Sequence, residues 1–141
     1  MDAPPPAKLV AIAPAAELTY HFSEYAKAQA DVDTIAAPKH VALTAQWLGS
    51  PSKWQPSSPL VSAAHIPSIP ASWPAKTLIL CGAADQLIDG SRIVVAKLKA
   101  AGKDVQYEEA VDMPHGYSSF PVFPAQAAAA WDRVVDFILA Q

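Results

Sequence analysis

The chain has 141 residues, of which 52% are hydrophobic and 16% are charged, and its net charge is −3. This length allows one domain with a core of its own. The small net charge without a basic cluster argues against a nucleic-acid partner, and no apolar run approaches the roughly 20 residues that span a bilayer. The single cysteine, Cys81, excludes an internal disulfide, and the first ten residues lack a secretion signal. We therefore expect a cytoplasmic protein without a membrane span.

The first part of the chain predicts one strand and two helices. Residues 8–14 (KLVAIAP) form a short apolar run that ends at a proline, which is typical of a buried strand. A weak helix is expected over about 22–30, and a second begins near Pro38 and stops at Gly49. The apolar side of this second helix is predicted to consist of Val41, Ala45 and Leu48.

A proline-rich connection follows these helices. Six of the 14 prolines fall between residues 51 and 74, where they forbid regular helix and central strand. Connections of this length are usually functional or disordered. This one, however, also carries large apolar side chains, which disordered linkers lack: Trp54, Leu60, Val61, Ile66, Ile69 and Trp73. We expect the segment to pack over a surface of the domain.

The last part of the chain predicts strand, helix, strand and helix. The strands are 77–82 (TLILCG) and 104–110 (DVQYEEA). Ser91 is the expected cap of the helix between them, and Pro124 opens the last helix. The apolar face of that last helix is predicted to be Trp131, Val134, Val135, Ile138 and Leu139, with Asp132, Arg133 and Asp136 toward water. This order is typical of the α/β class, with about three parallel strands and flanking helices.

Asp85 follows the first of these strands by three residues, and His115 follows the second by about five. Because a strand–helix–strand crossover makes the strands parallel, both residues should lie at the carboxyl edge of the sheet, where open α/β sheets place their sites. Neighbouring strands are about 5 Å apart. A carboxylate that accepts a hydrogen bond from one imidazole nitrogen fixes the tautomer and stabilises the imidazolium. We therefore predict an acid–base pair, with Asp85 orienting His115.

Simpler interpretations of these residues remain open from the sequence. His115 suits a solvated or capping role, and Asp85 suits a turn. Asp89 competes for the acid role, although its position near a helix start also fits a capping carboxylate. Asp112 with His115 would be a two-ligand metal site without a supporting cluster, so no metal or cofactor is predicted.

A nucleophile is missing from this pattern. None of the five glycines belongs to Gly-x-Ser-x-Gly, the strand-to-helix turn that carries the serine of acyl-transfer enzymes on such sheets. No His-Gly-Gly run is present to supply oxyanion-hole amides. Cys81 lies inside an apolar run, so we predict a buried core residue and not a substitute nucleophile.

Several motifs resemble α/β-hydrolase esterases of the hormone-sensitive-lipase-like group, which includes fungal steryl acetyl hydrolase-like enzymes. The apolar strand ending in Gly82 is followed by Asp-x-Leu-x-Asp at residues 85–89 and by Met-Pro-His-Gly at residues 113–116. Upstream, SSPLVSAAHIPSIPASWPAKTLIL is similar to the family's Ser-Pro-Leu segment, and AKLVAIAPAAELT to the strand after the nucleophile helix. The resemblance implies that Asp85 and His115 are the acid and base of a Ser-His-Asp triad.

The same resemblance implies the architecture and the activity. Residues 1–141 would be the C-terminal half of an α/β-hydrolase domain, with a strand, cap-associated helices and the proline-rich connection in 1–75 and the acid and base in 76–141. The reaction would be hydrolysis of a small apolar carboxylic ester, and the lone chain, without its serine, would be inactive. Tyr117, Phe120 and Phe123 would wall an acyl pocket or pack in the core.

The alternative function is a non-catalytic remnant. It would bind a hydrophobic ligand or a partner protein. In the resembled family a further strand pairs beside KLVAIA, so the open sheet edge would lead to self-association or to binding of the missing N-terminal half.

Overall fold

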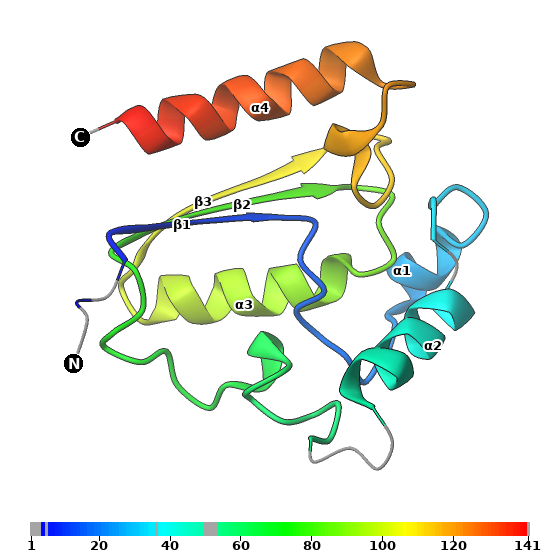
Figure 1. The fold of residues 1–141 in the computed structure, drawn as a ribbon, viewed down its shortest axis with the longest axis horizontal. Coiled ribbons are helices and arrows are strands. Elements are labelled where there is room, and N and C mark those ends of the chain that lie inside the picture. Colours follow the sequence, from blue (N-terminus) through cyan, green and yellow to red (C-terminus); the bar gives the residue numbers. More distant parts are fainter. Residues whose placement is uncertain (1–3, 5, 36, 50–53, 141) are drawn as a thin grey trace.

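The chain folds around a three-stranded parallel sheet. A computed structural model describes residues 4, 6–35, 37–49 and 54–140. In this part the strand order is β1 (Lys8–Ile12), β2 (Lys76–Gly82) and β3 (Asp104–Ala110). Figure 1 shows α3 (Ile88–Ala100) along one face of the sheet and α4 (Pro124–Leu139) along the other. The predicted α/β class with a parallel sheet is confirmed.

The middle strand β2 is buried on both faces. Successive side chains of a strand point to opposite faces, so Leu78 and Leu80 pack toward α4 while Ile79 and Cys81 pack toward α3. The α4 side of the core also contains Met113, Tyr117, Ala130, Val134 and Phe137. The α3 side contains Ile88, Val94, Val95 and Leu98. Cover on both faces explains why the sequence of β2 is a continuous apolar run and does not alternate.

Helix α4 is joined to the first strand by Lys8. The Lys8 ammonium donates hydrogen bonds to the carbonyl oxygens of Phe137 and Ile138, each at 2.9 Å, and to that of Ala140. These carbonyls lie at the end of the helix, where a cation is favoured by the helix dipole. The two ends of the described chain are thereby fastened to each other.

The predicted apolar face of α4 is wrong in part. Its buried residues are Ala130, Val134 and Phe137. Four of the five predicted residues are at least half exposed, namely Trp131, Val135, Ile138 and Leu139. We call these four the outer stripe of α4. The spacing of apolar residues gives α4 two apolar stripes, the outer stripe and the stripe of Ala130, Val134 and Phe137. The three strands cover only the second of these. No helix in the described ranges is long and apolar enough to cross a membrane.

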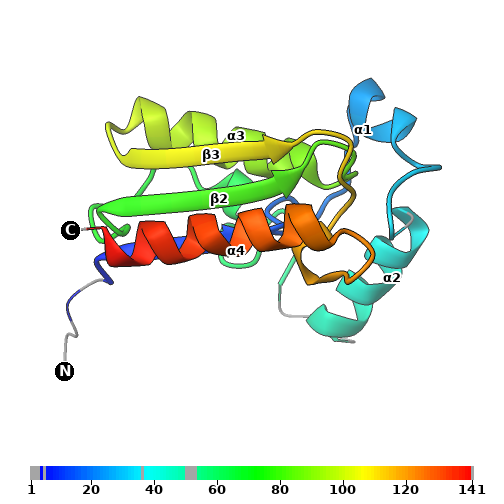
Figure 2. The same ribbon diagram turned by 90° about the horizontal axis from the view of Figure 1, so that it is seen from above.

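Helices α1 (Glu24–Ala28) and α2 (Ala37–Leu48) lie beyond the carboxyl ends of the strands (Figures 1 and 2). The first is shorter than predicted. The Ser23 hydroxyl caps it by accepting a hydrogen bond from the Ala26 amide at 3.2 Å. The Tyr25 hydroxyl then donates to the Ala83 carbonyl at 2.6 Å, which ties this helix to the loop after β2.

The predicted apolar side of α2 is not the side that faces the domain. Val41 and Ala45 are exposed, whereas His40 and Thr44 are buried. The Tyr20 hydroxyl explains the orientation, because it donates to the His40 carbonyl at 3.1 Å and forms a hydrogen bond with the Thr44 hydroxyl. A polar side of the helix therefore faces the domain.

Helix α3 begins at Ile88, earlier than the predicted cap at Ser91. Ser91 is 1% exposed and lies inside the helix. Its hydroxyl accepts a hydrogen bond from the Cys81 thiol at 3.2 Å. The residue thus joins α3 to β2 instead of capping the helix.

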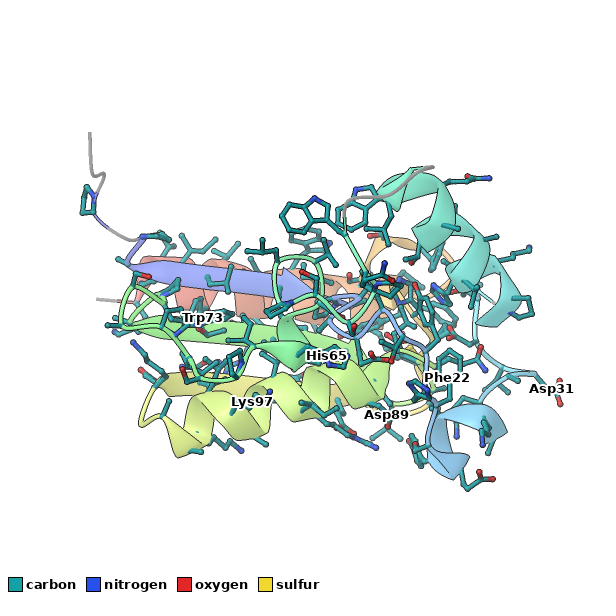
Figure 3. The ribbon with its side chains drawn as sticks, turned by 90° about the horizontal axis from the view of Figure 1, so that it is seen from below. Phe22, Asp31, His65, Trp73, Asp89 and Lys97 are labelled. Atoms are coloured by element: carbon teal, nitrogen blue, oxygen red, sulfur yellow. The ribbon has the colours of Figure 1, made fainter. Side chains whose placement is uncertain are left out.

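The proline-rich connection packs over α3, so its predicted packing is confirmed for some of its apolar residues. Ile69 and Trp73 pack against the core on this side, whereas Leu60 is 73% exposed. A short 3-10 helix, Ala63–His65, is held by Lys97 of α3, whose ammonium donates to the Ala64 and Ile66 carbonyls at 2.7 Å. Figure 3 shows Trp73, His65 and Lys97 along this surface.

Candidate active site

The candidate site lies where the loops after β2 and β3 meet. The Ala84 amide donates to the Met113 carbonyl at 2.9 Å, so the two loops are in direct contact. Gly82 makes this approach possible. A Cβ atom at Gly82 would lie 2.0 Å from the Met113 carbonyl oxygen and 2.5 Å from that of Pro114, far inside van der Waals contact. The loop that carries His115 is therefore positioned against the backbone at the end of β2.

Asp85 and His115 form a hydrogen bond at this edge of the sheet. His115 Nδ1 lies 3.1 Å from Asp85 Oδ2. The Asp85 side chain is 1% exposed and that of His115 is 19% exposed. Asp85 Oδ1 accepts a second hydrogen bond from the Leu87 amide at 2.7 Å. The carboxylate is thus fixed by two partners, and it leaves His115 Nε2 as the ring nitrogen available for proton transfer.

The surroundings favour the charged form of His115. Burial lowers the pKa of the ring, but the hydrogen bond and the negative charge of Asp85, with a further contribution from the Asp33 carboxylate, outweigh burial and raise it. A buried carboxylate that stabilises an imidazolium is the arrangement that a general base of this kind requires.

Asp33 links both loops to the segment before α2. Its Oδ1 accepts a hydrogen bond from the His115 amide at 2.8 Å, and its Oδ2 accepts one from the Gln86 amide at 2.8 Å. The neighbouring Thr34 hydroxyl donates to the His115 carbonyl at 2.9 Å. One carboxylate therefore holds the backbone of the predicted base and of the residue after the predicted acid. No local motif in the sequence marks this link, so Asp33 is not among the predicted site residues.

Replacing Asp33 with asparagine should loosen the His115 loop. One oxygen becomes an amide group that cannot accept a hydrogen bond, so we expect a loss of about 2 kcal/mol in the free energy of unfolding. We also expect a lower pKa for His115, because the Asp33 charge contributes to raising it. Urea unfolding and an NMR titration of the ring would measure both effects.

Asp31→Asn is the matched control for this prediction. It makes the same change of charge nearby, but Asp31 is exposed and points away from the domain (Figure 3). The two variants should therefore differ in stability and in the His115 titration. Equal effects would mean that the link does not hold the loop.

A cavity of about 420 Å³ lies beside His115, between α2 and the segment after β1. Its wall is mainly apolar and includes Leu18, Leu43, Trp47, Val61 and Leu87. This volume is in the range of small-molecule sites. Tyr117 and Phe123 pack on the α4 side of the core instead. The core-packing interpretation of these two aromatic residues is therefore the one that fits, and the predicted acyl wall is not formed by them.

The other residues singled out in the sequence do not join the pair. Asp89 accepts hydrogen bonds from the Ser23 amide and hydroxyl at 2.8 and 2.9 Å, so it joins α3 to α1 (Figure 3). Cys81 is fully buried, as predicted, and burial raises the pKa of its thiol to about 12, which makes it a poor nucleophile. Asp112 is exposed. In the described ranges no three His, Cys, Asp or Glu side chains gather in a possible metal site.

Comparison with solved structures gives several similar esterases. A hormone-sensitive lipase from a metagenome library has a TM-score of 0.81 and 26% identity, over 99% of this chain and 45% of that one. An esterase of the bacterial hormone-sensitive lipase family has a TM-score of 0.81 and 26% identity, over 94% and 42%. An esterase/lipase from an uncultured bacterium has a TM-score of 0.79 and 26% identity, over 94% and 42%. The chain thus spans less than half the length of these proteins.

The sequence comparisons show which family the chain belongs to. No curated protein matches the chain. A sequence model described as the alpha/beta hydrolase fold matches residues 1–119, which is most of the chain, and the structural similarity extends over the same region. The chain therefore belongs to the alpha/beta hydrolase fold family.

Proposed function

We propose that the chain carries the acid and the base of a serine carboxylic ester hydrolase related to the hormone-sensitive lipases. Asp85 is the orienting acid and His115 is the general base. The observation that carries this proposal is the 3.1 Å contact between His115 Nδ1 and Asp85 Oδ2 at the carboxyl edge of the sheet, in a chain similar to solved esterases. The adjoining apolar cavity supports a small apolar ester as substrate.

The proposed reaction proceeds in two acyl-transfer steps. A serine hydroxyl attacks the ester carbonyl carbon while His115 Nε2 takes the serine proton, and Asp85 stabilises the resulting imidazolium. The tetrahedral intermediate collapses, the carbon–oxygen bond to the alcohol breaks, and His115 returns the proton to the departing alcohol oxygen. A water molecule then attacks the acyl-serine by the same route and releases the carboxylic acid and the free serine.

The serine of this proposal comes from outside the 141 residues. The printed sequence contains no Gly-x-Ser-x-Gly, and the similar esterases are more than twice as long as this chain. We therefore propose that residues 1–141 are the C-terminal part of a larger hydrolase domain. Residues 1–75 would supply a strand and cap-associated helices, and 76–141 the acid and base. The fungal steryl acetyl hydrolase-like group is the proposed subgroup.

Complementation tests the proposal. The lone chain should hydrolyse p-nitrophenyl acetate no faster than buffer. Co-expression with an N-terminal hydrolase segment that contains the serine turn, taken from the coding sequence directly upstream or from one of the similar esterases, should restore turnover. His115→Gln in the same complex should return turnover to background. Two results would contradict the proposed roles. One is activity of the lone chain that depends on His115, and the other is activity of the complex that is unchanged by His115→Gln.

A second candidate function is a partner-binding remnant. Two observations favour it: within the described residues no strand pairs with the outer edge of β1, and the outer stripe of α4 is exposed. An open edge beside apolar surface invites association. The complementation experiment also separates this candidate, because a stable complex without His115-dependent turnover would support binding without catalysis.

A further inference from the structure

His40 has an unusual position in the cavity beside His115. The residue is 5% exposed and forms part of the cavity wall. Its Nε2 atom is buried and has no hydrogen-bond partner in the described structure. Buried polar groups are almost always paired, so an unpaired nitrogen in a cavity wall calls for an explanation. A bound ligand that forms a hydrogen bond with this nitrogen would be such an explanation.

The state of the His40 ring defines what that partner must be. Burial lowers the pKa of His40, and the neighbouring His115 lowers it further, so the ring is neutral near neutral pH. The charges of Asp33 and Asp85 and the Ile35 backbone act in the opposite direction but do not outweigh these two effects. We assign the single proton of the neutral ring to Nδ1, on the side of the Ile35 backbone, because Nε2 has no partner. The unpaired Nε2 of a neutral ring protonated at Nδ1 is a hydrogen-bond acceptor.

Apart from His115 Nε2, which is left for proton transfer, the other polar side chains of this wall have partners. The Tyr20 and Thr44 hydroxyls form a hydrogen bond with each other, and Tyr20 also donates to the His40 carbonyl. The His115 ring is paired with Asp85. Among the described residues of the wall, the unmet buried hydrogen-bonding capacity is therefore that of His40 Nε2. An ester carbonyl has no proton to offer it, whereas a hydroxyl group does.

The two imidazole rings lie close together. Their centroids are 5.3 Å apart, and the planes meet at 74° in an edge-to-face arrangement. A ligand group bound to His40 would consequently lie within a few bonds of an ester bond presented to His115. The acceptor and the proposed base belong to one binding site.

We propose that His40 Nε2 accepts a hydrogen bond from a hydroxyl group of the substrate, so that the site prefers short apolar esters with a free hydroxyl near the ester carbonyl. This inference rests on the proposed function, because it names the substrate class of the same site. The apolar wall binds the hydrocarbon part of the ester, and the neutral imidazole selects the hydroxyl.

Binding to the chain as it stands tests the preference. Ethyl butyrate and ethyl β-hydroxybutyrate differ by one hydroxyl group. NMR titration should give a dissociation constant about tenfold lower for the hydroxylated ester, the effect of one well-placed hydrogen bond. His40→Phe keeps a flat ring and removes the acceptor, so it should abolish the difference between the two dissociation constants. His21→Phe makes the same change at an exposed histidine and should leave the preference intact.

A second measurement needs no variant. The nitrogen NMR signal of His40 Nε2 should shift on addition of the hydroxylated ester and stay in place with ethyl butyrate. Equal affinities for the two esters, a preference that survives His40→Phe, or no binding of either ester at millimolar concentration would each overturn the inference. If turnover of p-nitrophenyl acetate is restored in the complex but the hydroxylated ester is not preferred, only the inference about His40 is wrong. If the hydroxylated ester is preferred but the complex shows no turnover, the proposed catalytic roles of Asp85 and His115 are wrong.

Discussion

Replacing Asp85 with asparagine should lower the turnover number of the complemented enzyme by about 10³–10⁴-fold, the cost of losing the acid that orients a triad histidine. The amide group cannot stabilise an imidazolium, and it allows the ring to adopt the wrong tautomer. Because Asp85 contributes most of the upward shift in the pKa of His115, burial would then dominate and the pKa would fall below its usual value.

The pH profile distinguishes this cause from a general structural loss. The base must be neutral to accept a proton, so kcat/KM should rise with pH through the raised pKa of His115 in the wild type. In the variant the inflection should move to lower pH, with a much lower plateau. Asp89→Asn is the matched control, because Asp89 binds Ser23 and not the imidazole. An inflection that stays in place after Asp85→Asn would contradict the proposed pair.

The same pair links folding stability to pH. A histidine whose pKa is raised in the folded state stabilises the fold most when the ring is protonated. The contribution of His115 should therefore be complete below its unfolded value of 6.5 and be lost as the pH rises through its higher folded pKa. The Asp85→Asn variant should lack this gain in folding stability at acidic pH.

Gly82→Ala should cost about 3 kcal/mol of the free energy of unfolding, the upper range for forcing an atom into a packed core. The added methyl group would meet the Met113 and Pro114 carbonyls, and neither backbone can move without displacing the His115 loop. We also expect the pKa of His115 to fall, since the ring would move away from Asp85. Urea unfolding and an NMR titration would measure these effects.

Gly102→Ala provides the comparison for this substitution. Gly102 has a φ of +68°, and an added Cβ atom there would meet nothing within 4 Å, so alanine carries backbone strain of about 1–2 kcal/mol without a clash. The His115 titration should be unchanged. If Gly82→Ala costs no more than Gly102→Ala, the close approach of the two loops is not a constraint on the fold.

The sheet and its edge follow from local sequence patterns. The continuous apolar run of β2 and the motifs after β2 and β3 predict parallel strands and a meeting of Asp85 with His115, because parallel topology fixes where strand ends lie. Helix faces are less predictable. In α4 two apolar stripes are present, and only packing against three strands decides that Val134 is buried while Val135 is half exposed.

Side-chain contacts that the strand topology does not itself bring together could not be predicted from the sequence. Asp33 and His115 are 82 positions apart, and Asp33 stands in a short polar stretch that carries no motif. The inward side of α2 is set by the Tyr20 hydroxyl, and no pattern in the sequence marks His40 as a buried residue. Ser91 resembled a helix cap because its burial against Cys81 depends on the sheet.

The position of Asp33 has a consequence for protein engineering. Helix α2 forms part of the cavity wall and is a natural cassette to exchange when substrate range is to be altered. A chimera with its junction upstream of Asp33 would lose the carboxylate that holds the His115 and Gln86 amides. Its low activity would then be attributed wrongly to the exchanged cavity wall. Donor segments should therefore be grafted downstream of Thr34, whose hydroxyl completes the attachment.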